Sequence, residues 1–417
     1  MQKTDNWQRI WNDDGGSSRY APAKTILYAI SLPYRLIINL RNWLYDHKIF
    51  REIKLSSPVI SVGNITAGGT GKTPCVIWLA RMLKENGFRP VILSRGYGGK
   101  SSQPVNIVSD GKDILLSNIM AGDEPYLIAR TLPDIPVITG PKRVLTGKTA
   151  IEKFGADVLI CDDAFQHRQI FRDINLVLLD SGKPLGNGHL LPRGILREPP
   201  SALHRADAFI LTRSKKEETF EKLPLASLRG AKRRGNRTRG CNPLFCYRLL
   251  HFVRNDTCAV FQKSQETTRT INGLGQINNI PVFRSSHQPV GLVSGDYTRQ
   301  LTLTQLKGKR VHAFSGIAKP DSFEKAIADA GAKITAFDIF PDHHHYTTRE
   351  LENIRHNFLK DKADLLITTE KDGMRLQEFT NFLSDIYLLC ITMEIIPDEN
   401  ALKKFILKKL GKKQAED

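Results

Sequence analysis

Apolar runs that end on polar residues alternate with segments of helical periodicity along two stretches of this chain. In the first stretch, runs typical of buried strands occupy residues 58–62, 90–94, 136–139, 158–161, 175–180 and 208–212. In the second stretch, the pattern predicts strands at 311–314, 333–337 and 365–368, with helices at 322–330 and 348–359. Strands that alternate with helices are typical of parallel sheets with helices on both faces. We therefore predict a doubly wound, mostly parallel α/β domain followed by a second, smaller α/β domain.

The length of 417 residues favours two or more domains. We predict an N-terminal tail and helix at 1–50, a larger domain at 51–243, a linker at 244–308, and a smaller lid domain with a C-terminal helix at 309–417. Short strands near 244–248 and 257–262 are expected to form a hairpin that joins the two domains.

Residues 25–50 are rich in apolar side chains, but a proline and two arginines interrupt them too often for a membrane span of about 20 apolar residues. On a helix that starts after Pro33, the apolar side chains fall on one face and the polar ones on the other. The apolar face consists of Leu36, Leu40, Trp43 and Leu44. An amphipathic helix of this kind lies either in a membrane interface or on the protein's own core, and periodicity alone favours neither.

A glycine-rich loop joins the first apolar run to a helical pattern at 76–83. From residue 63 it reads G-N-I-T-A-G-G-T-G-K-T-P. Such glycines let backbone N–H groups approach a polyphosphate, the lysine reaches the β- and γ-phosphates, and the hydroxyl beside it ligates Mg²⁺. Thr66 stands where the P-loop pattern has its first glycine. We predict a P-loop that binds a nucleoside triphosphate through Gly68, Gly69, Thr70, Gly71, Lys72 and Thr73.

Two carboxylates, Asp162 and Asp163, directly follow the apolar run at 158–161. Ligands of open parallel sheets bind at the carboxyl ends of the strands. A carboxylate in that position holds Mg²⁺ directly or through water. We therefore predict that both aspartates and Thr73 hold Mg²⁺; the alternative is a polar turn after a strand.

The formal net charge of +18 calls for an anionic partner, which is nucleic acid, a nucleotide or an acidic membrane surface. Within an insertion at 214–279, basic residues crowd the run 229–239, and no aromatic residues are interleaved in that run, which does not favour nucleic acid. The six scattered cysteines indicate a reducing compartment, and the polar N-terminus lacks the pattern of a signal peptide. A loose group in the insertion matches no common zinc spacing: Cys241, Cys246, His251 and Cys258.

Further motifs follow the P-loop in a fixed order. They are S-R-G-Y-G from residue 94, G-D-E-P from 122, G-P-K-R from 140, D-D-A-F-Q-H-R from 162, L-R-E-P from 196 and F-P-D-H-H-H-Y from 340. With these motifs the chain resembles the tetraacyldisaccharide 4'-kinase family, the lipid A 4'-kinases of Gram-negative bacteria, over about residues 25–410. The resemblance implies transfer of the γ-phosphate of ATP, with Mg²⁺, to the 4'-hydroxyl of a tetraacylated glucosamine disaccharide 1-phosphate. It also implies that the protein is located at the cytoplasmic face of the inner membrane, and it favours a position in the membrane interface for the N-terminal helix.

The resemblance assigns a catalytic base pair to Asp123 and His343. Taken from the sequence alone, Asp123 in G-D-E-P reads as the N-cap of a helix, and the histidines at 343–345 read as a solvated loop or a transition-metal site. In the family, the aspartate acts as the base and the histidine of the D-H motif supports it. The P-loop lysine, here Lys72, stabilises the transferring phosphate. A carboxylate and an imidazole suit this task because each fixes the protonation of the other.

The remaining site residues follow from the same resemblance. Glu198 resembles a family residue that helps to hold the metal; on its own it reads as half of a surface ion pair. The residues expected near the nucleotide or the lipid phosphate are Gln166, His167, Arg95, Tyr97 and Arg143. Residues 369–372 lack the asparagine of a guanine-recognition motif, so we expect an adenine nucleotide.

Two other functions stay open beside the kinase. A P-loop GTPase or metallochaperone would need a guanine-specific loop and gives no reason for an interfacial helix. A nucleic-acid-associated ATPase is favoured only by the net charge. We therefore expect a lipid substrate and a membrane surface as partners, and no nucleic acid.

Overall fold

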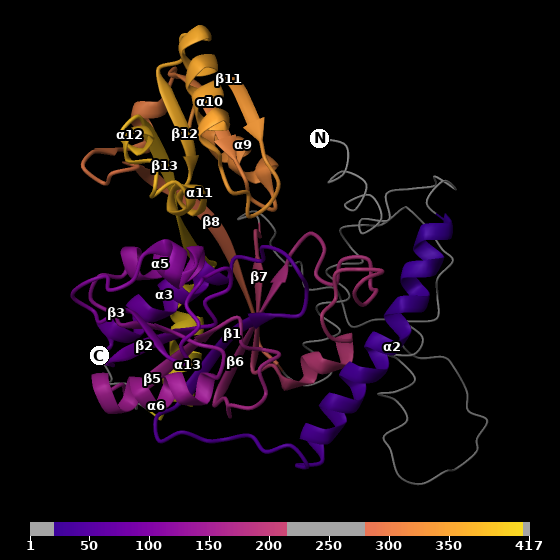
Figure 1. The fold of residues 1–417 in the computed structure, drawn as a ribbon. Coiled ribbons are helices and arrows are strands. Elements are labelled where there is room, and N and C mark those ends of the chain that lie inside the picture. Colours follow the sequence, from indigo (N-terminus) through magenta and orange to yellow (C-terminus); the bar gives the residue numbers. More distant parts are fainter. Residues whose placement is uncertain (1–20, 215–279, 412–417) are drawn as a thin grey trace, which may run out of the picture.

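The computed structural model describes residues 21–214 and 280–411. Within these residues, one sheet of 13 strands extends from one end of the molecule to the other (Figure 1). The strands are β1 (Val59–Asn64), β2 (Pro90–Ser94), β3 (Asn106–Ser109), β4 (Val137–Thr139), β5 (Val158–Asp162), β6 (Ile174–Asp180), β7 (Ala208–Thr212), β8 (Val282–Ser294), β9 (Gln300–Leu301), β10 (Arg310–Ser315), β11 (Lys333–Ile339), β12 (Leu365–Thr369) and β13 (Ile386–Ile396). Their order is β11-β10-β12-β13-β8-β7-β6-β1-β5-β2-β4-β3, and β9 pairs with β8 outside this path.

Helices cover the sheet and connect its strands (Figure 1). They are α2 (Ala21–Asp46), α3 (Lys72–Glu85), α4 (Asn118–Ala121), α5 (Asp123–Thr131), α6 (Arg143–Phe154), α9 (Pro320–Asp329), α10 (Thr348–Lys360), α11 (Glu370–Arg375), α12 (Thr380–Leu383) and α13 (Glu399–Lys409), with short 3-10 helices η2 (Pro200–Arg205) and η3 (Leu303–Leu306). Local sequence fixes several ends. Helix α10 starts with a capping box between Thr347 and Glu350, and α6 ends at Gly155 in the left-handed conformation.

The predicted fold class is confirmed, because the sheet is mostly parallel and every predicted strand of the two α/β stretches is present. Strand β1 lies between β5 and β6 and is parallel to both. The chain leaves β1 toward β2 on one side, and it leaves β5 toward β6 on the other. The carboxyl ends of β1 and β5 therefore border a topological switch point, which is where ligands of such sheets bind.

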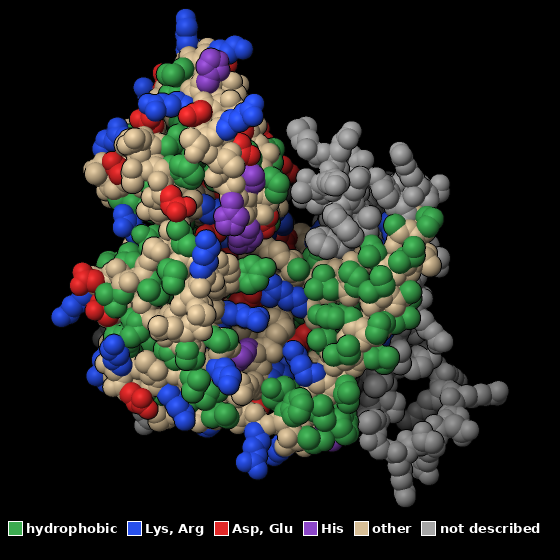
Figure 2. Space-filling model, viewed as in Figure 1, with side chains coloured by type: hydrophobic (Ala, Val, Ile, Leu, Met, Phe, Trp, Pro, Cys, Tyr) green, Lys and Arg blue, Asp and Glu red, His purple; other side chains and the backbone are tan. Residues whose placement is uncertain are grey.

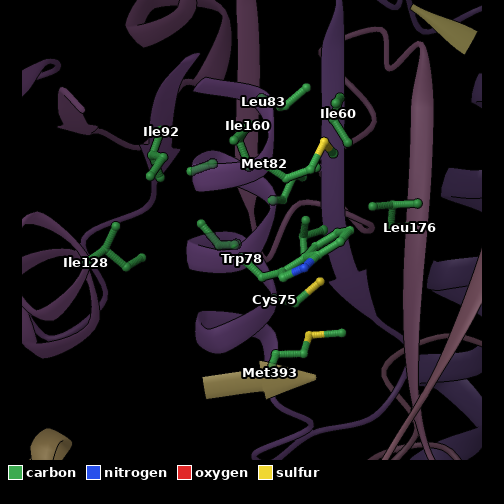
Figure 3. Packing of buried hydrophobic residues seen from close by; sticks show 14 of the residues in the cluster. Ile60, Cys75, Trp78, Met82, Leu83, Ile92, Ile128, Ile160, Leu176 and Met393 are labelled. Atoms are coloured by element: carbon green, nitrogen blue, oxygen red, sulfur yellow. The ribbon is translucent and has the colours of Figure 1, made fainter. Parts of the chain in front are cut away.

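The core of the first domain forms between α3 and the strands behind it. Trp78 and neighbouring apolar side chains of α3 pack with Ile60 of β1 and Ile160 of β5 (Figure 3). Leu402 of α13 belongs to the same buried cluster, and the Trp78 indole donates to Glu399 of α13 at 2.9 Å. The C-terminal helix thus follows the second α/β stretch in sequence but packs on the core of the first.

Two long strands that the sequence did not predict connect the two halves of the molecule. Strands β8 and β13 pair antiparallel, from Ser294 opposite Tyr387 to Arg284 opposite Ile396. On its other side β8 pairs with β7, and β13 pairs with β12. Both strands rise from the lower to the upper half in Figure 1. The hairpin predicted at 244–248 and 257–262 and the possible zinc group lie outside the described residues, and the domain boundary at residue 309 stays a prediction.

Helix α2 turns its polar side chains toward the protein. Tyr34 Oη donates to the Arg197 carbonyl at 2.8 Å, and Arg168 donates to Asp46 at 2.7 Å and to the Asn42 carbonyl at 3.2 Å. The helix starts well before Pro33, which lies inside it, because one missing hydrogen bond does not end a helix of 26 residues. In the part of the chain described, no helix is both long and apolar enough to cross a membrane.

The opposite face of α2 is exposed and apolar. Hydrophobic side chains gather along the helix on the right of Figure 2. Leu36, Ile37 and Leu40 are 70%, 65% and 58% exposed. A helix that packs on the protein's core buries such side chains. The orientation of α2 is therefore the reverse of that expected for a core helix.

Candidate active site

The glycine-rich loop joins the end of β1 to the start of α3, as a P-loop requires. Gly71 adopts a left-handed φ of 83°, which a side chain disfavours. The Asn64 side chain donates to Thr70 Oγ1 at 2.9 Å, and the Gln166 side chain donates to the Asn64 carbonyl at 2.8 Å. These bonds hold the loop with Lys72 in the first turn of α3.

Asp162 ends β5 beside the loop and is buried. Ser94 donates to its Oδ2 at 3.2 Å, whereas its Oδ1 has no hydrogen-bond partner among the described residues. Burial and the nearby carboxylates of Glu124 and Asp163 raise the pKa of Asp162 to about 7. A buried oxygen without a partner in a negatively charged setting is suited to a cation.

Asp163 lies between two cationic side chains. Its carboxylate is 3.7 Å from Lys72 Nζ and accepts from Arg197 Nη1 at 2.9 Å. Burial alone would raise the pKa of Asp163, but Lys72 and Arg197 outweigh burial and lower it. The P-loop lysine is therefore held at the strand end that carries both aspartates.

Asp123 and His343 come from different halves of the molecule and meet at one guanidinium. Asp123 is the first residue of α5, and its N-cap is Gly122, so Asp123 is not the cap that the sequence alone suggested. Arg375 Nε donates to Asp123 Oδ2 at 2.6 Å, and Arg375 Nη2 lies 3.2 Å from His343 Nδ1. The His343 ring itself is 3.7 Å from Asp123 Oδ2.

One cavity of about 1390 Å³ brings most of the predicted residues together. Its lining includes Gly68, Gly69, Thr70, Gly71, Lys72, Thr73, Arg95, Tyr97, Asp123, Arg143, Asp162, Asp163, Gln166, His167 and His343. Lys319 and Phe323 from the second α/β stretch also line it, and so do Tyr34 and Arg41 of α2. Of the predicted site residues, all within the described part of the chain, Glu198 alone is not in this lining.

Glu198 is buried completely between two arginines. Its carboxylate forms ion pairs with Arg41 of α2 and with Arg205 of η2. Two guanidinium groups already neutralise this carboxylate, so its surroundings do not favour the metal-binding role that we expected. Through Arg41 it joins α2 to the first domain, and its metal-binding role stays a prediction.

Some predicted phosphate ligands have other partners. Arg143 is buried and donates to the Gly140 carbonyl at 2.7 Å and to the Asp162 carbonyl at 3.2 Å, so it supports the strand end rather than reaching outward. Burial, together with Arg143 and Arg172, lowers the pKa of His167 to about 4, which keeps its ring neutral. Tyr97 is 78% exposed, and its ring centroid is 6.4 Å from that of His343.

Sequence reasoning missed the residues that bridge the two halves. Besides Arg375, these are Lys371, which pairs with Glu124, and Lys319, which pairs with Asp180. Lys371 and Arg375 lie in and just after the T-T-E-K-D segment at the end of β12, and such polar strand ends were a usable signal. In the described ranges, no three His, Cys, Asp or Glu side chains group as ligands of one ion, so the alternative of a transition-metal site at 343–345 has no support.

Fold and site together define the class: an α/β P-loop kinase whose second domain supplies part of the site. A family model described as tetraacyldisaccharide-1-P 4'-kinase matches residues 23–240 and 249–411. The chain belongs to this family, as its motifs indicated.

Individual relatives agree with the family model. The tetraacyldisaccharide 4'-kinase of Syntrophus aciditrophicus is 44% identical over 401 residues, which are 96% of this chain and 97% of the relative. That of Desulfatibacillum aliphaticivorans is 37% identical over 88% of each chain. The crystal structure of LpxK from Aquifex aeolicus in complex with ATP matches with a TM-score of 0.66 and 31% identity, covering 93% of this chain and 99% of that one.

Proposed function

We propose that this protein transfers the γ-phosphate of ATP to the 4'-hydroxyl of tetraacyldisaccharide 1-phosphate. The observation that carries the proposal is the single cavity lined both by the P-loop with Lys72 and by Asp123 and His343. Its volume of about 1390 Å³ exceeds the range of roughly 300–1,000 Å³ that is usual for one small ligand. The cavity thus has room for a nucleotide and a disaccharide headgroup side by side.

Asp123 acts as the base in this proposal. The hydroxyl oxygen forms its bond to the γ-phosphorus while the bond from that phosphorus to the bridging oxygen of ADP breaks, and the hydroxyl proton passes to the Asp123 carboxylate. Burial alone would raise the pKa of Asp123, but the neighbouring His343 ring and the hydrogen-bonded Arg375 guanidinium outweigh burial and lower the pKa. The carboxylate is therefore ionised and able to accept the proton at neutral pH.

Lys72 and the strand-end aspartates stabilise the phosphates. Lys72 supplies positive charge where negative charge accumulates on the transferring group. The unpartnered Oδ1 of Asp162 and the Thr73 hydroxyl fit Mg²⁺, which binds through one or two carboxylates together with phosphates and water. When bound, Mg²⁺ neutralises phosphate charge. Asp163 orients Lys72, and Glu198 stays outside this set.

We place the protein at the cytoplasmic face of the inner membrane, with α2 lying in the interface. The outward apolar face of α2 and the Arg41 and Tyr34 side chains at the cavity border support this placement. A lipid held by its acyl chains in the bilayer would present its headgroup beside the helix.

The proposed transfer is tested with γ-labelled ATP and tetraacyldisaccharide 1-phosphate in detergent micelles. We expect labelled lipid from the wild type. We also expect a loss of transfer, with ATP affinity retained, in Asp123→Asn and in His343→Ala. Release of labelled inorganic phosphate without labelled lipid would contradict the proposal and favour a simple NTPase.

The placement of α2 is tested by flotation with vesicles that contain anionic lipid. The triple change Leu36→Ser, Ile37→Ser and Leu40→Ser should lower vesicle binding and leave thermal unfolding nearly unchanged, because these side chains are exposed. Leu359→Ser, at an equally exposed leucine on α10, is the matched control and should not alter binding. Undiminished binding of the triple variant would show that another surface anchors the protein.

A further inference from the structure

We propose that Arg375 is a positioning residue for phosphoryl transfer, which places the Asp123 carboxylate and the His343 imidazole relative to each other. The inference rests on the proposed function, because it concerns the same pair of groups at the same hydroxyl. It names a residue outside the P-loop and outside the G-D-E-P and D-H motifs.

The guanidinium of Arg375 is fixed on all sides. Its Nη1 donates to the Gly316 carbonyl at 2.8 Å and to Asp372 Oδ1 at 3.0 Å, and the side chain is only 2% exposed. Asp372 is buried and also accepts from Tyr346 Oη at 3.0 Å. These bonds leave Nε and Nη2 directed at the two proposed catalytic groups, with little freedom to rotate.

Asp123 and His343 each lie closer to Arg375 than they lie to each other. The bonds from Arg375 to Asp123 and to His343 measure 2.6 Å and 3.2 Å. The direct distance from His343 Nδ1 to Asp123 Oδ2 is 3.7 Å, which is beyond hydrogen-bond range. The guanidinium is therefore the group that sets the spacing of the two side chains.

The same contact assigns the protonation of the His343 ring. A guanidinium has donors only, so His343 Nδ1 must accept the hydrogen bond from Arg375, and the neutral ring carries its proton on Nε2. On Asp123, Arg375 engages Oδ2, and we assign the hydroxyl proton to Oδ1.

The contact also joins the two halves of the molecule. Arg375 ends α11 of the second domain, whereas Asp123 begins α5 of the first. Lys371 of α11 pairs with Glu124 of α5, and the Asn118 side chain donates to the Met374 carbonyl at 2.8 Å. Correct spacing of the base pair thus requires that α11 lie against α5, which couples the position of the second domain to chemistry.

The test compares kcat and KM for Arg375→Lys with the wild type, using labelled ATP and the lipid substrate. Lysine keeps the charge but not the fork that reaches both groups. We expect kcat to fall about 10²-fold, as for a small misplacement of reacting groups, with KM for ATP changed by less than about threefold. In an Asp123→Asn background, the same change should lower kcat by less than about threefold further, because the two residues act as a unit.

Two controls separate positioning from folding. Arg355→Lys alters another arginine of the second domain, which lies on α10 and pairs with Asp385 at 2.9 Å, and it should leave kcat unchanged. Arg375→Ala should regain part of its lost kcat when guanidinium ion is added, which a misfolded protein would not do. If Arg375→Ala does not fold, the Arg375→Lys comparison still decides.

The outcomes distinguish this inference from the proposed function. A wild type that yields no labelled lipid refutes the proposed function. A wild type that is active and an Asp123→Asn variant with a strongly lowered but measurable kcat, together with an unchanged kcat in Arg375→Lys, refute the role of Arg375 alone. Fully multiplicative effects of Arg375→Lys and Asp123→Asn would refute it as well.

Discussion

Gly71→Ala is expected to destabilise the protein through a defined clash inside the P-loop. A Cβ at this position would lie 2.5 Å from both Cε1 and Nε2 of His287, a distance that real side chains do not adopt. His287 belongs to β8, where it pairs with Met393 of β13, so its backbone is fixed by the sheet. The ring must therefore turn, or the loop must move.

The magnitude has two parts. The left-handed φ of 83° costs an alanine about 1–2 kcal/mol. Overpacking against the His287 ring adds about 1–3 kcal/mol. We expect the free energy of unfolding, measured by urea denaturation without nucleotide, to fall by about 2–5 kcal/mol in total. The affinity for ATP should fall as well, because the loop that contacts phosphate is displaced.

Two further variants isolate the steric part. Gly68 has a φ of 103°, but no atom of the described residues lies within 4 Å of a Cβ built there, so Gly68→Ala should show backbone strain alone. In a His287→Ala background, Gly71→Ala should cost only the strain of about 1–2 kcal/mol. An equal cost of Gly71→Ala with and without the histidine would refute the clash between Gly71 and His287.

Three other changes have defined expectations. Lys72→Ala should lower kcat by about 10²–10³-fold with little change in thermal unfolding, because it removes charge from the transferring phosphate; steady-state kinetics and a thermal melt measure both. Glu198→Gln leaves Arg41 and Arg205 without their shared carboxylate and should lower the free energy of unfolding by about 3–5 kcal/mol in urea denaturation. The folded state lowers the pKa of His167 from 6.5 to about 4, so the unfolded chain binds the extra proton first and stability is lost as pH falls between these values. His167→Asn should therefore show a smaller loss of stability from pH 6.5 to 4 than the wild type, and an identical loss would show that other groups govern it.

Sequence predicted the parallel strands well because their residues are buried on both faces. Strands β1, β2, β5 and β7 have every residue buried, and such runs are continuous in apolar letters. Strand β8 differs, since it mixes Arg284, His287 and Pro289 with apolar residues and has a half-exposed pattern. Its length follows from antiparallel pairing with β13, which a local pattern does not reveal.

The site residues differ in the same way in how far the local sequence predicts them. Lys72, Asp162 and Asp163 could be placed from the strand ends that carry them, because neighbouring parallel strands end at one edge of the sheet. Arg375 reaches Asp123 from 252 positions away, and Arg41 reaches Glu198 from 157 positions away. Such pairings depend on how the domains and α2 pack, so the sequence revealed neither Arg375 nor the two arginine partners of Glu198.

The most direct test of the central claim is the fate of the γ-phosphate of ATP. The purified protein is incubated with γ-labelled ATP, Mg²⁺ and tetraacyldisaccharide 1-phosphate, and the position of the new phosphate on the lipid is read by NMR or mass spectrometry. The account predicts label on the 4'-oxygen from the wild type and far slower labelling by Asp123→Asn at equal ATP occupancy. Label found only in inorganic phosphate, or equal labelling of the lipid by both proteins, would contradict it.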